Sequence, residues 1–461
     1  MTLQRILAAT DGEPIHRQAL PERFRICTDT RLLERGDTFL ALRGDRFDGH
    51  AFVMQALHAG ASAVIVDDRS VLPHGAAAIV VGDTKAAYLA LAAAARRQLR
   101  APVVAITGST GKTTTKAFLT QILERSGAGN ILATPANENN ELGVSKLLLG
   151  ASDDADVLVI EFGARHYGDI ATLVSIARPD IAVLTNVGDA HLEVMGSPER
   201  LAETKWSIFS GGALPVLNAD DAVSRKRAPS LSIAPRWFGI VSAGATLPSA
   251  PPEGTFLRGR DELVVVASQR RHSFPVRCTV PGEHNRANVA AACAAALRLG
   301  IEPARVANAI ERLELPAGRY ERTRLGDLEL IFDAYNASMA GTLATLDTFA
   351  GERADRRIAV LSSMAELGDG AVQMHERVGA AAAHSNLAAL LVGGDHACDL
   401  ERGARGAGID AERLVRFTNN QEAVRWLHRN ARAGDVVLLK GSRRYHLEEI
   451  VAGLTEAQPS P

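Results

Sequence analysis

The sequence predicts an α/β protein with several domains. Its 461 residues exceed what one hydrophobic core usually organises, so about two to four domains are expected. Short, almost continuously apolar runs alternate with helical stretches, which is typical of parallel strands joined by crossover helices. Hydrophobic residues make up 46% and charged residues 23% of the chain, the composition of a globular protein.

Residues 1–83 alternate short strands and turns and predict a small N-terminal α/β domain. It contains "DTFLALRG", a helical "AFVMQALHAG" and the apolar "ASAVIVDD". The alanine-rich stretch 84–100 predicts a helix, because alanine has the highest helix propensity, and Pro102 follows its end. We expect this helix to join the first domain to the second.

Residues 84–316 predict a central domain with a mainly parallel sheet. Its strands are "VVAIT" (103–107), "VLVIEF" (157–162) and "IAVLTNV" (181–187), and a helix begins at Lys112. Residues 232–280 are richer in proline and serine and contain "ELVVVAS", which predicts an antiparallel patch. A further helix over 286–300 closes at Gly300.

Residues 317–461 predict a C-terminal Rossmann-like domain that lacks a G-x-G-x-x-G fingerprint. Apolar runs alternate here with helical segments, and the runs are "LELIFDAY", "RIAVLSS", "LAALLVGG", "RLVRF" and "DVVLLKGS".

Composition also excludes several classes of partner. The net charge of −2 gives no reason to expect binding to nucleic acid or to an anionic membrane. No apolar run approaches the roughly 18 residues of a membrane span, and "MTLQRILAATDGE" is too short in apolar residues for a signal peptide. The four cysteines are scattered without C-x-x-C, so neither a disulfide framework nor a zinc site is predicted.

The stretch "TGSTGKT" (107–113) lies between a predicted strand and a predicted helix and indicates a phosphate-binding loop. Gly108 and Gly111 allow backbone N–H groups to turn toward phosphate, and the helix N-terminus adds its positive dipole end. Lys112 would neutralise the β- and γ-phosphates, and the Thr113 hydroxyl can reach Mg²⁺. The alternative is an ordinary turn with a chance G-K-T. Since Ile106 stands where the usual pattern has glycine, a generic kinase or GTPase is disfavoured.

Three further residues follow the central strands. Glu161 ends one strand, where a carboxylate can hold magnesium, although charged residues commonly end strands. His191 lies just past the next strand, and Lys205 lies on the helix that follows. Taken singly, these two would be a solvated histidine and a surface lysine.

Together these stretches resemble the Mur ligase family of ATP-dependent amide ligases. The loop at 107–113 is similar to the family's T-G-[ST]-x-G-K-T, residues 186–193 to N-x-x-x-A-H-L-E, and residues 281–288 to P-G-x-H-N-x-x-N. Lys205 corresponds to the family's modified lysine. The resemblance covers nearly the whole chain and implies a UDP-substrate domain (1–83), an ATP-binding domain (84–316) and a domain that binds the amine substrate (317–461).

Within the family, the similarity is greatest to the branch that adds D-alanyl-D-alanine to UDP-N-acetylmuramoyl-tripeptide in peptidoglycan precursor synthesis. The stretches that carry it are "TDTRLLERGDTFLALRGDRFDGHAF", "NENNELGV", "DAYNAS", "MAELG" and "LLKGSR". The D-N-P-R motif of the diaminopimelate-adding branch is absent.

The resemblance implies formation of an acyl phosphate from ATP and a carboxylate, followed by attack of an amine. Thr113 and Glu161 would hold one Mg²⁺, and His191 and Lys205 a second, with Lys205 carbamylated because an ammonium is a poor magnesium ligand. An unmodified Lys205 that pairs with phosphate is the alternative. The remaining loop residues Gly108, Ser109, Thr110, Gly111 and Thr114 would contact the nucleotide.

The resemblance also implies roles for residues outside the loop. Asn285 and Asn288 would lie by the adenine, and Arg319, Asp333 and Tyr335 by the ribose and phosphates. The UDP end would be bound by Thr30, Arg31, Asp48 and His50. Further substrate contacts would come from Asn137, Asn139, Asn140 and Asn336. The partners would be small molecules, with no nucleic acid and no membrane insertion, and the protein would be a cytoplasmic monomer.

Several residues depart from the family pattern, mostly in the third domain. They are Ala136, Ser145, Phe332, Ser338, Ser362 and Ser363. The residues expected at the phosphates and metals are unchanged, which disfavours a catalytically silent binding protein. A relative that uses the same chemistry on another carboxylate and amine stays open.

Overall fold

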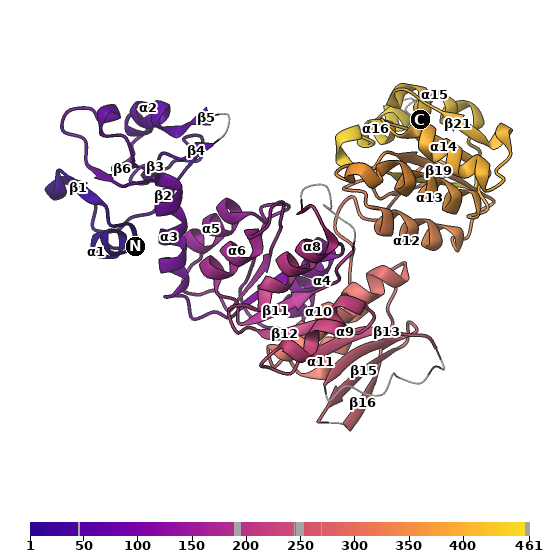
Figure 1. Ribbon diagram of the computed structural model, residues 1–461, viewed down its shortest axis with the longest axis horizontal. Helices are drawn as coiled ribbons and strands as arrows, with labels where there is room; N and C mark the ends of the chain where they lie inside the picture. The colour runs from indigo at the N-terminus through magenta and orange to yellow at the C-terminus, as the bar shows by residue number, and fades with distance from the viewer. Residues whose placement is uncertain (45–46, 189–194, 244, 246–252, 269, 457–461) are drawn as a thin grey trace. The chain divides into compact units, whose positions relative to one another are not determined.

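The computed structural model describes residues 1–44, 47–188, 195–243, 245, 253–268 and 270–456 (Figure 1). The chain divides into two compact units. The first comprises residues 1–105, 129–163 and 168–180, and the second comprises 106–128, 164–167 and 181–461. Among the described residues, no helix combines the length and hydropathy that a membrane span requires.

The first unit begins with a five-stranded sheet in the order β1-β7-β6-β3-β2. Strands β2, β3, β6 and β7 run parallel, while β1 is antiparallel to β7. The strands are β1 (Glu13–Ile15), β2 (Ile26–Cys27), β3 (Thr38–Leu40), β6 (Ala63–Val66) and β7 (Ala78–Val80), and a separate hairpin pairs β4 (Arg43–Gly44) with β5 (Phe47–Asp48). This confirms the small α/β domain predicted from the alternating strands and turns.

Alternate side chains of these strands enter two apolar clusters on opposite faces of the sheet, as the period of two requires. Leu40 and Ile65 belong to one cluster, and Phe39 and Val64 belong to the other. The helices of this unit are α1 (Leu3–Thr10), α2 (Val53–His58), α3 (Thr84–Arg96), α5 (Glu141–Gly150) and α6 (Asp169–Ala177). The alanine-rich α3 is the helix predicted at 84–100.

A second sheet has nine strands in the order β16-β15-β14-β13-β12-β11-β8-β10-β9. The strands are β8 (Val103–Thr107), β9 (Ile131–Ala133), β10 (Val157–Glu161), β11 (Ile181–Leu184), β12 (Leu214–Asn218), β13 (Arg236–Val241), β14 (Gly254–Arg258), β15 (Glu262–Ala267) and β16 (Arg270–Pro275). The three predicted strands of the central domain are β8, β10 and β11.

The antiparallel patch predicted over 232–280 is confirmed only in part. β14, β15 and β16 form an antiparallel meander, but β13 runs parallel to both β12 and β14. The prediction was wrong for β13. Its direction relative to β14 depends on the long connection 242–253, and that stretch has no hairpin-turn sequence of the kind that joins antiparallel strands.

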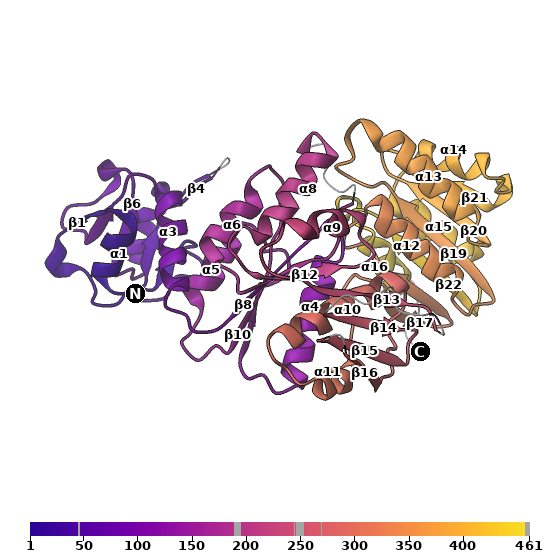
Figure 2. The same cartoon turned by 60° about the horizontal axis from the view of Figure 1, so that its bottom comes forward.

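Helix α4 (Lys112–Arg125) begins at the predicted residue and packs against α10 (Glu283–Arg298). Seven consecutive side chains of α10, from Ala290 to Ala296, are 0% exposed. Because six of them are alanine, the helix can lie close to α4 on one side and to β13 and β14 on the other (Figure 2). The other helices of this region are α8 (Pro198–Trp206), α9 (Ala222–Arg227) and α11 (Pro303–Ile310).

The third sheet has the order β17-β18-β22-β19-β20-β21. Its strands are β17 (Glu321–Leu325), β18 (Leu328–Phe332), β19 (Arg356–Ser362), β20 (Ala389–Gly393), β21 (Leu414–Arg416) and β22 (Asp435–Lys440). All are parallel except β17, which confirms the Rossmann-like alternation. The helices are α12 (Met339–Ala350), α13 (Ala371–Ala383), α14 (Ala397–Gly406), α15 (Asn420–Asn430) and α16 (Glu448–Glu456).

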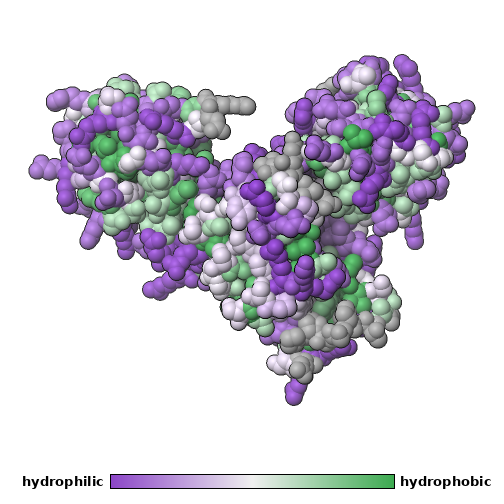
Figure 3. All heavy atoms as spheres, viewed as in Figure 1, coloured by the Kyte–Doolittle hydropathy of each residue, from purple (hydrophilic) through white to green (hydrophobic). Residues whose placement is uncertain are grey.

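Both faces of this third sheet are covered by helices, shown in orange and yellow in Figure 1. Ala359 and Leu361 of β19 pack into the cluster that holds side chains of α12, α13 and α14. Ile358 and Val360 pack into the opposite cluster with α15 and α16. The face in Figure 3 is mainly hydrophilic. Among the described residues of the first unit, the exposed large apolar side chains are Leu32, Phe47, Phe52 and Met54.

Candidate functional site

The predicted phosphate-binding stretch forms a tight turn between β8 and α4, here called the glycine loop (residues 107–112). Gly108 has φ +153° and Gly111 has φ +81°, values that residues with a side chain rarely adopt. A Cβ added at Gly108 would overlap Thr185 Oγ1, and one at Gly111 would overlap Asn288 Oδ1. Both glycines are therefore required by backbone conformation and by close neighbours.

The loop is braced by the residues that follow β11. The Asn186 carbonyl accepts the Ser109 N–H at 3.0 Å, and its side-chain Oδ1 accepts the Thr110 N–H at 3.1 Å. Asn186 Nδ2 donates to Thr110 Oγ1 at 2.9 Å, and Thr185 Oγ1 donates to the Thr110 carbonyl at 2.6 Å. Ser109 and Thr110 thus attach the loop to segment 185–188. This brace was not predicted, although two polar residues directly after a buried strand were a usable signal.

The N-terminus of α4 offers its backbone N–H groups beside this loop. The first intrahelical bond runs from the Thr115 N–H to the Gly111 carbonyl at 2.8 Å, so the N–H groups of Lys112, Thr113 and Thr114 precede the ladder. The Lys112 ammonium donates to the Gly108 carbonyl at 2.8 Å and lies over the loop. Donors and a cation converge there, as an anionic phosphate requires.

Helix α10 contributes Asn288, whose side chain lies against Gly111 and accepts a bond from Thr115 Oγ1 at 3.3 Å. Asn285 is also buried, and its amide donates to the Pro281 carbonyl at 3.0 Å. Asn288 therefore contacts the glycine loop itself, while Asn285 holds the start of its own helix.

Glu161 ends β10 and is only 2% exposed. Its Oε1 accepts the Asn139 amide at 2.8 Å, and its backbone N–H donates to Thr134 Oγ1 at 3.0 Å. Two of the predicted residues nearby also bond locally: the Asn139 carbonyl accepts the Gly163 N–H, and the Asn140 side chain caps α5 by accepting the Gly143 N–H. The third, Asn137, is exposed. A buried carboxylate held in this way is a suitable ligand for a hard cation.

Lys205 lies on α8 and is completely buried, at 0% exposure. One turn earlier, the Arg200 guanidinium lies over the Tyr167 ring at 5.0 Å. His191, the other residue predicted for a second metal ion, lies outside the described residues.

The carboxyl ends of β18 and β22 carry a group of charged side chains. Lys440 Nζ lies 3.2 Å from Asp333 Oδ2 and donates to the Asn336 carbonyl at 2.8 Å. Burial lowers the pKa of Lys440, and the Asp333 carboxylate opposes that shift. Arg319 and Arg443 both lie over the Tyr335 ring, 4.8 Å and 5.6 Å from its centroid. Of these residues, Lys440 and Arg443 had appeared in the sequence only as part of a motif.

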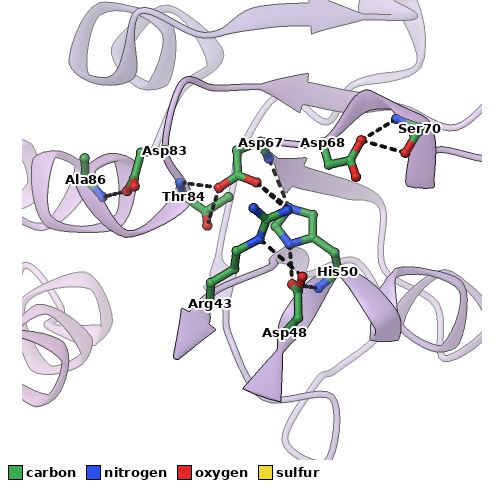
Figure 4. Close-up of polar contacts among 9 residues, drawn as sticks. All are labelled: Arg43, Asp48, His50, Asp67, Asp68, Ser70, Asp83, Thr84 and Ala86. Carbon is green, nitrogen blue, oxygen red and sulfur yellow. Dashed lines mark hydrogen bonds and ion pairs between the residues drawn. The ribbon is translucent and has the colours of Figure 1, made fainter. Parts of the chain in front are cut away.

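The N-terminal residues predicted at the UDP end fall into two groups. Arg31 is exposed and pairs with Asp29, whose pKa it lowers to about 2, and Thr30 lies between them in the chain. His50 is 5% exposed: its Nδ1 lies 2.7 Å from Asp48 Oδ1, and its Nε2 accepts the Asp67 N–H at 3.1 Å (Figure 4).

Arg43 completes this second group by pairing with Asp48 at 3.3 Å and with Asp67 at 3.1 Å. The His50 backbone N–H, followed by its ring, holds the pKa of Asp48 below its ordinary value. Both ring nitrogens of His50 are bound to protein, so this residue positions Asp48 and the β4–β5 hairpin, while Asp48 stays accessible to solvent.

These arrangements suit a nucleotide and a divalent cation. The glycine loop has the backbone space that a phosphate needs, since side chains at Gly108 and Gly111 would fill it. The buried Glu161 carboxylate in the first unit and the Thr113 hydroxyl in the second unit each offer an oxygen donor that Mg²⁺ prefers. Taken separately, the residues of the two units fit a nucleotide phosphate and a hard cation.

Comparison with protein families finds three matches along the chain. The profile "Mur ligase family, catalytic domain" matches residues 25–106, "Mur ligase middle domain" matches 106–296, and "Mur ligase, glutamate ligase domain" matches 318–443.

Individual proteins match over nearly the full length. The chain is 37% identical over 444 residues to the UDP-N-acetylmuramoyl-tripeptide–D-alanyl-D-alanine ligase of Synechocystis sp., covering 94% of this chain and 92% of that protein. The crystal structure of MurF from Acinetobacter baumannii has a TM-score of 0.85 and 30% identity, covering 99% and 98% of the two chains. MurF from Thermotoga maritima in complex with ADP has a TM-score of 0.79 and 26% identity, covering 94% and 97%.

Proposed function

This chain belongs to the Mur ligase family, and we propose that it joins D-alanyl-D-alanine to UDP-N-acetylmuramoyl-tripeptide in an ATP-dependent reaction that releases ADP and phosphate. The product would be the UDP-linked pentapeptide precursor of peptidoglycan. The observation that carries the proposal is the match to ligases of this activity across more than nine-tenths of both chains.

The three predicted segments divide the work of the reaction. Residues 1–83 bind the UDP end of the first substrate, residues 84–316 bind ATP, and residues 317–461 bind the amine substrate. The five-stranded sheet, the glycine loop on the nine-stranded sheet and the Rossmann-like sheet support this division.

The chemistry activates a carboxylate that cannot condense with an amine in neutral water. An oxygen of the tripeptide carboxylate attacks the γ-phosphorus of ATP, the bond to ADP breaks, and an acyl phosphate forms. The neutral amine of D-alanyl-D-alanine then attacks the acyl carbon. Phosphate leaves with the oxygen that came from the carboxylate, and the amine nitrogen loses a proton. The protein must bring a carboxylate and a triphosphate together against their mutual repulsion.

Lys112 and the N-terminal N–H groups of α4 bind and orient the phosphates, and Gly108, Ser109, Thr110, Gly111 and Thr114 shape that site. On the family's residue pattern, Thr113 and Glu161 would hold one Mg²⁺, and His191 and Lys205 would hold a second. Magnesium held there would supply charge neutralisation between the two anionic substrates.

Lys205 is proposed to carry a carbamate. Its side chain is completely buried, and burial favours the neutral amine that can add CO₂. The amine nitrogen forms a bond to the CO₂ carbon and releases a proton, which replaces an ammonium with a carboxylate suited to a metal ion.

The remaining proposed contacts follow the same pattern. Asn285, Asn288, Arg319, Asp333 and Tyr335 bind the nucleotide, with Asn288 also shaping the glycine loop. Thr30, Arg31 and Asp48 bind the UDP end, and His50 positions Asp48. The substrates near the reacting carboxylate are contacted by Asn137, Asn139, Asn140 and Asn336. The protein is proposed to act as a monomer in the cytoplasm on small-molecule substrates alone.

The test is phosphate release from purified protein with Mg-ATP and UDP-N-acetylmuramoyl-tripeptide, with and without D-alanyl-D-alanine, and mass spectrometry of the product. The proposal expects release that requires both substrates and a product heavier by one D-alanyl-D-alanine residue pair. Bound ATP without turnover of these substrates would instead assign the same chemistry to another carboxylate and amine. That outcome would reject the proposed substrates.

A further inference from the structure

We propose that the second unit contains an anion-binding site, separate from the glycine loop, that takes a small polyanion, either a polyphosphate or a polycarboxylate. A cavity of about 580 Å³ lies where the end of α4, the end of β16 and α11 meet. Its charged lining consists of Arg125, Arg277, Arg312 and Glu311. The volume lies within the range of roughly 300–1,000 Å³ that is usual for small-molecule sites.

The charge of the cavity is unbalanced. Three guanidinium groups face one carboxylate, and within the described part of the chain none of the three is in an ion pair. Toward the described residues, the Arg125 guanidinium has a single polar contact, of 3.5 Å from Nη2 to Gln121 Oε1. By contrast, Arg258 pairs with Glu262 at 2.8 Å and Arg356 with Asp435. A concave surface with several unmatched cations attracts anions.

The walls of the cavity are tied together. The Gln121 side chain of α4 donates to the Glu314 carbonyl at 2.8 Å and accepts the Glu314 N–H at 2.9 Å. Arg305 of α11 donates to the Ser126 carbonyl, just past α4, at 3.2 Å. Helix α11 also packs on both α4 and β16 (Figure 2). The elements that carry the three arginines are therefore joined to one another before a ligand binds, while the arginine side chains themselves are exposed.

The cavity is separate from the glycine loop along α4. Lys112 is the first residue of the helix and Arg125 is the last, 14 residues in all. At about 1.5 Å per residue, roughly 20 Å separates the two ends. A ligand at Arg125 therefore cannot be the same molecule as a phosphate at Lys112.

The lining defines the class of ligand. Each guanidinium matches a phosphate or carboxylate with two parallel hydrogen bonds, and three of them suit two or more anionic groups. Asn308 adds an amide, and Val276 with the alanines of α11 adds a small apolar wall. A compact polyphosphate or polycarboxylate satisfies all of these features.

The experiment is calorimetric titration of the full chain with inorganic pyrophosphate and, separately, with citrate, in metal-free buffer at about 0.1 M salt, where exposed charges are screened beyond roughly 10 Å. The variant Arg277→Gln/Arg312→Gln removes two of the three cations. The variant Arg270→Gln/Arg271→Gln makes the same charge change on exposed residues of β16 outside the cavity. Lys112→Ala removes the cation of the glycine loop, so it distinguishes anion binding at that loop from anion binding in the cavity.

We expect at least one probe to bind one site that survives Lys112→Ala. The cavity variant should weaken this site at least about tenfold, because charge-assisted hydrogen bonds are lost, while the β16 control retains wild-type affinity. Binding of pyrophosphate alone identifies phosphate chemistry, and binding of citrate alone identifies carboxylate chemistry. Equal weakening by both variants, or no binding that survives Lys112→Ala, would overturn the proposal. Unchanged thermal midpoints of these exposed-residue variants check that folding is intact.

Discussion

Gly111 illustrates how a single backbone position determines the glycine loop. Its φ of +81° strains any side chain by about 1–3 kcal/mol, and an added Cβ also overlaps Asn288 Oδ1. Gly212 has a similar φ of +77°, but nothing lies within 4 Å of an added Cβ. A comparison of alanine substitutions at Gly111 and Gly212 therefore distinguishes the effect of backbone strain from that of steric overlap.

We therefore predict that Gly111→Ala weakens ATP binding at least about tenfold, whereas Gly212→Ala lowers only stability. Fluorescence titration with a nucleotide analogue, together with thermal melting of both variants, checks this. Equal ATP affinity in the two variants would show that contact with Asn288 is unimportant to the loop.

Lys205 is the second residue whose environment determines its chemistry. We predict that Lys205→Ala abolishes turnover, since the proposed carbamate is lost, and that added acetate restores part of it. Removal of dissolved CO₂ and bicarbonate should slow the wild-type enzyme, and intact-protein mass spectrometry should show the mass of one added CO₂.

Lys205→Arg is the matched control, because it retains a positive charge that cannot be carbamylated. If this variant kept wild-type turnover, Lys205 would act as a cation toward phosphate and the carbamate would be rejected.

At the scale of elements, segment 185–188 after β11 holds the loop in place. Asn186→Ala removes a bond accepted from the Thr110 N–H and another donated to Thr110 Oγ1. At about 1 kcal/mol for each bond, we predict lower stability and weaker ATP binding. Asn420→Ala is the control, because the Asn420 amide donates to the carbonyls of Tyr445 and His446, which are distant in sequence from the glycine loop. The control should lose stability but retain ATP affinity.

Helix α13 is linked to the end of β19 by a titratable residue. His375 is 0% exposed; its Nε2 accepts the Met364 N–H at 2.9 Å, and its ring stacks on His396 at 4.4 Å. Burial, opposed by the Ala371 carbonyl and assisted by His396, lowers the pKa of His375.

A histidine with a depressed folded-state pKa is neutral in the native protein, so the unfolded chain binds more protons as pH falls. The contribution of His375 to the free energy of unfolding is then complete at pH values above the unfolded pKa of about 6.5, and it declines as the pH falls below that value. We predict that His375→Gln, which retains an acceptor for Met364, flattens the decline of the urea midpoint between about pH 7 and pH 5.5. A slope equal to that of the wild type would exclude His375 as the group responsible.

Sequence patterns were sufficient where one local signal determines an element. The start of α4 at Lys112 follows from the glycine loop, and the five parallel strands of the third sheet follow from their apolar runs. The direction of β13 did not, because it depends on a long connection. The brace by Asn186 and the stacking of Arg443 on Tyr335 also required the fold, since each joins residues distant in sequence.

For the whole molecule, the chain combines a nucleotide-phosphate site, a buried carboxylate and a buried lysine with a separate Rossmann-like sheet. In the proposed reaction these features serve one purpose, which is to activate a carboxylate with ATP before an amine attacks it. Ser362 and Ser363, which depart from the family pattern, lie in the domain proposed to bind the amine, and the sequence of the glycine loop, Glu161 and Lys205 keeps the pattern.

The acyl-phosphate mechanism is tested most directly by tracing a carboxylate oxygen of the substrate into the released phosphate. UDP-N-acetylmuramoyl-tripeptide labelled with ¹⁸O in its terminal carboxylate would be converted with ATP and D-alanyl-D-alanine, and the released phosphate analysed by mass spectrometry. Attack of the carboxylate on the γ-phosphorus predicts one ¹⁸O atom in each phosphate, with the other retained in the new amide. Pentapeptide product accompanied by unlabelled phosphate would contradict the acyl-phosphate mechanism.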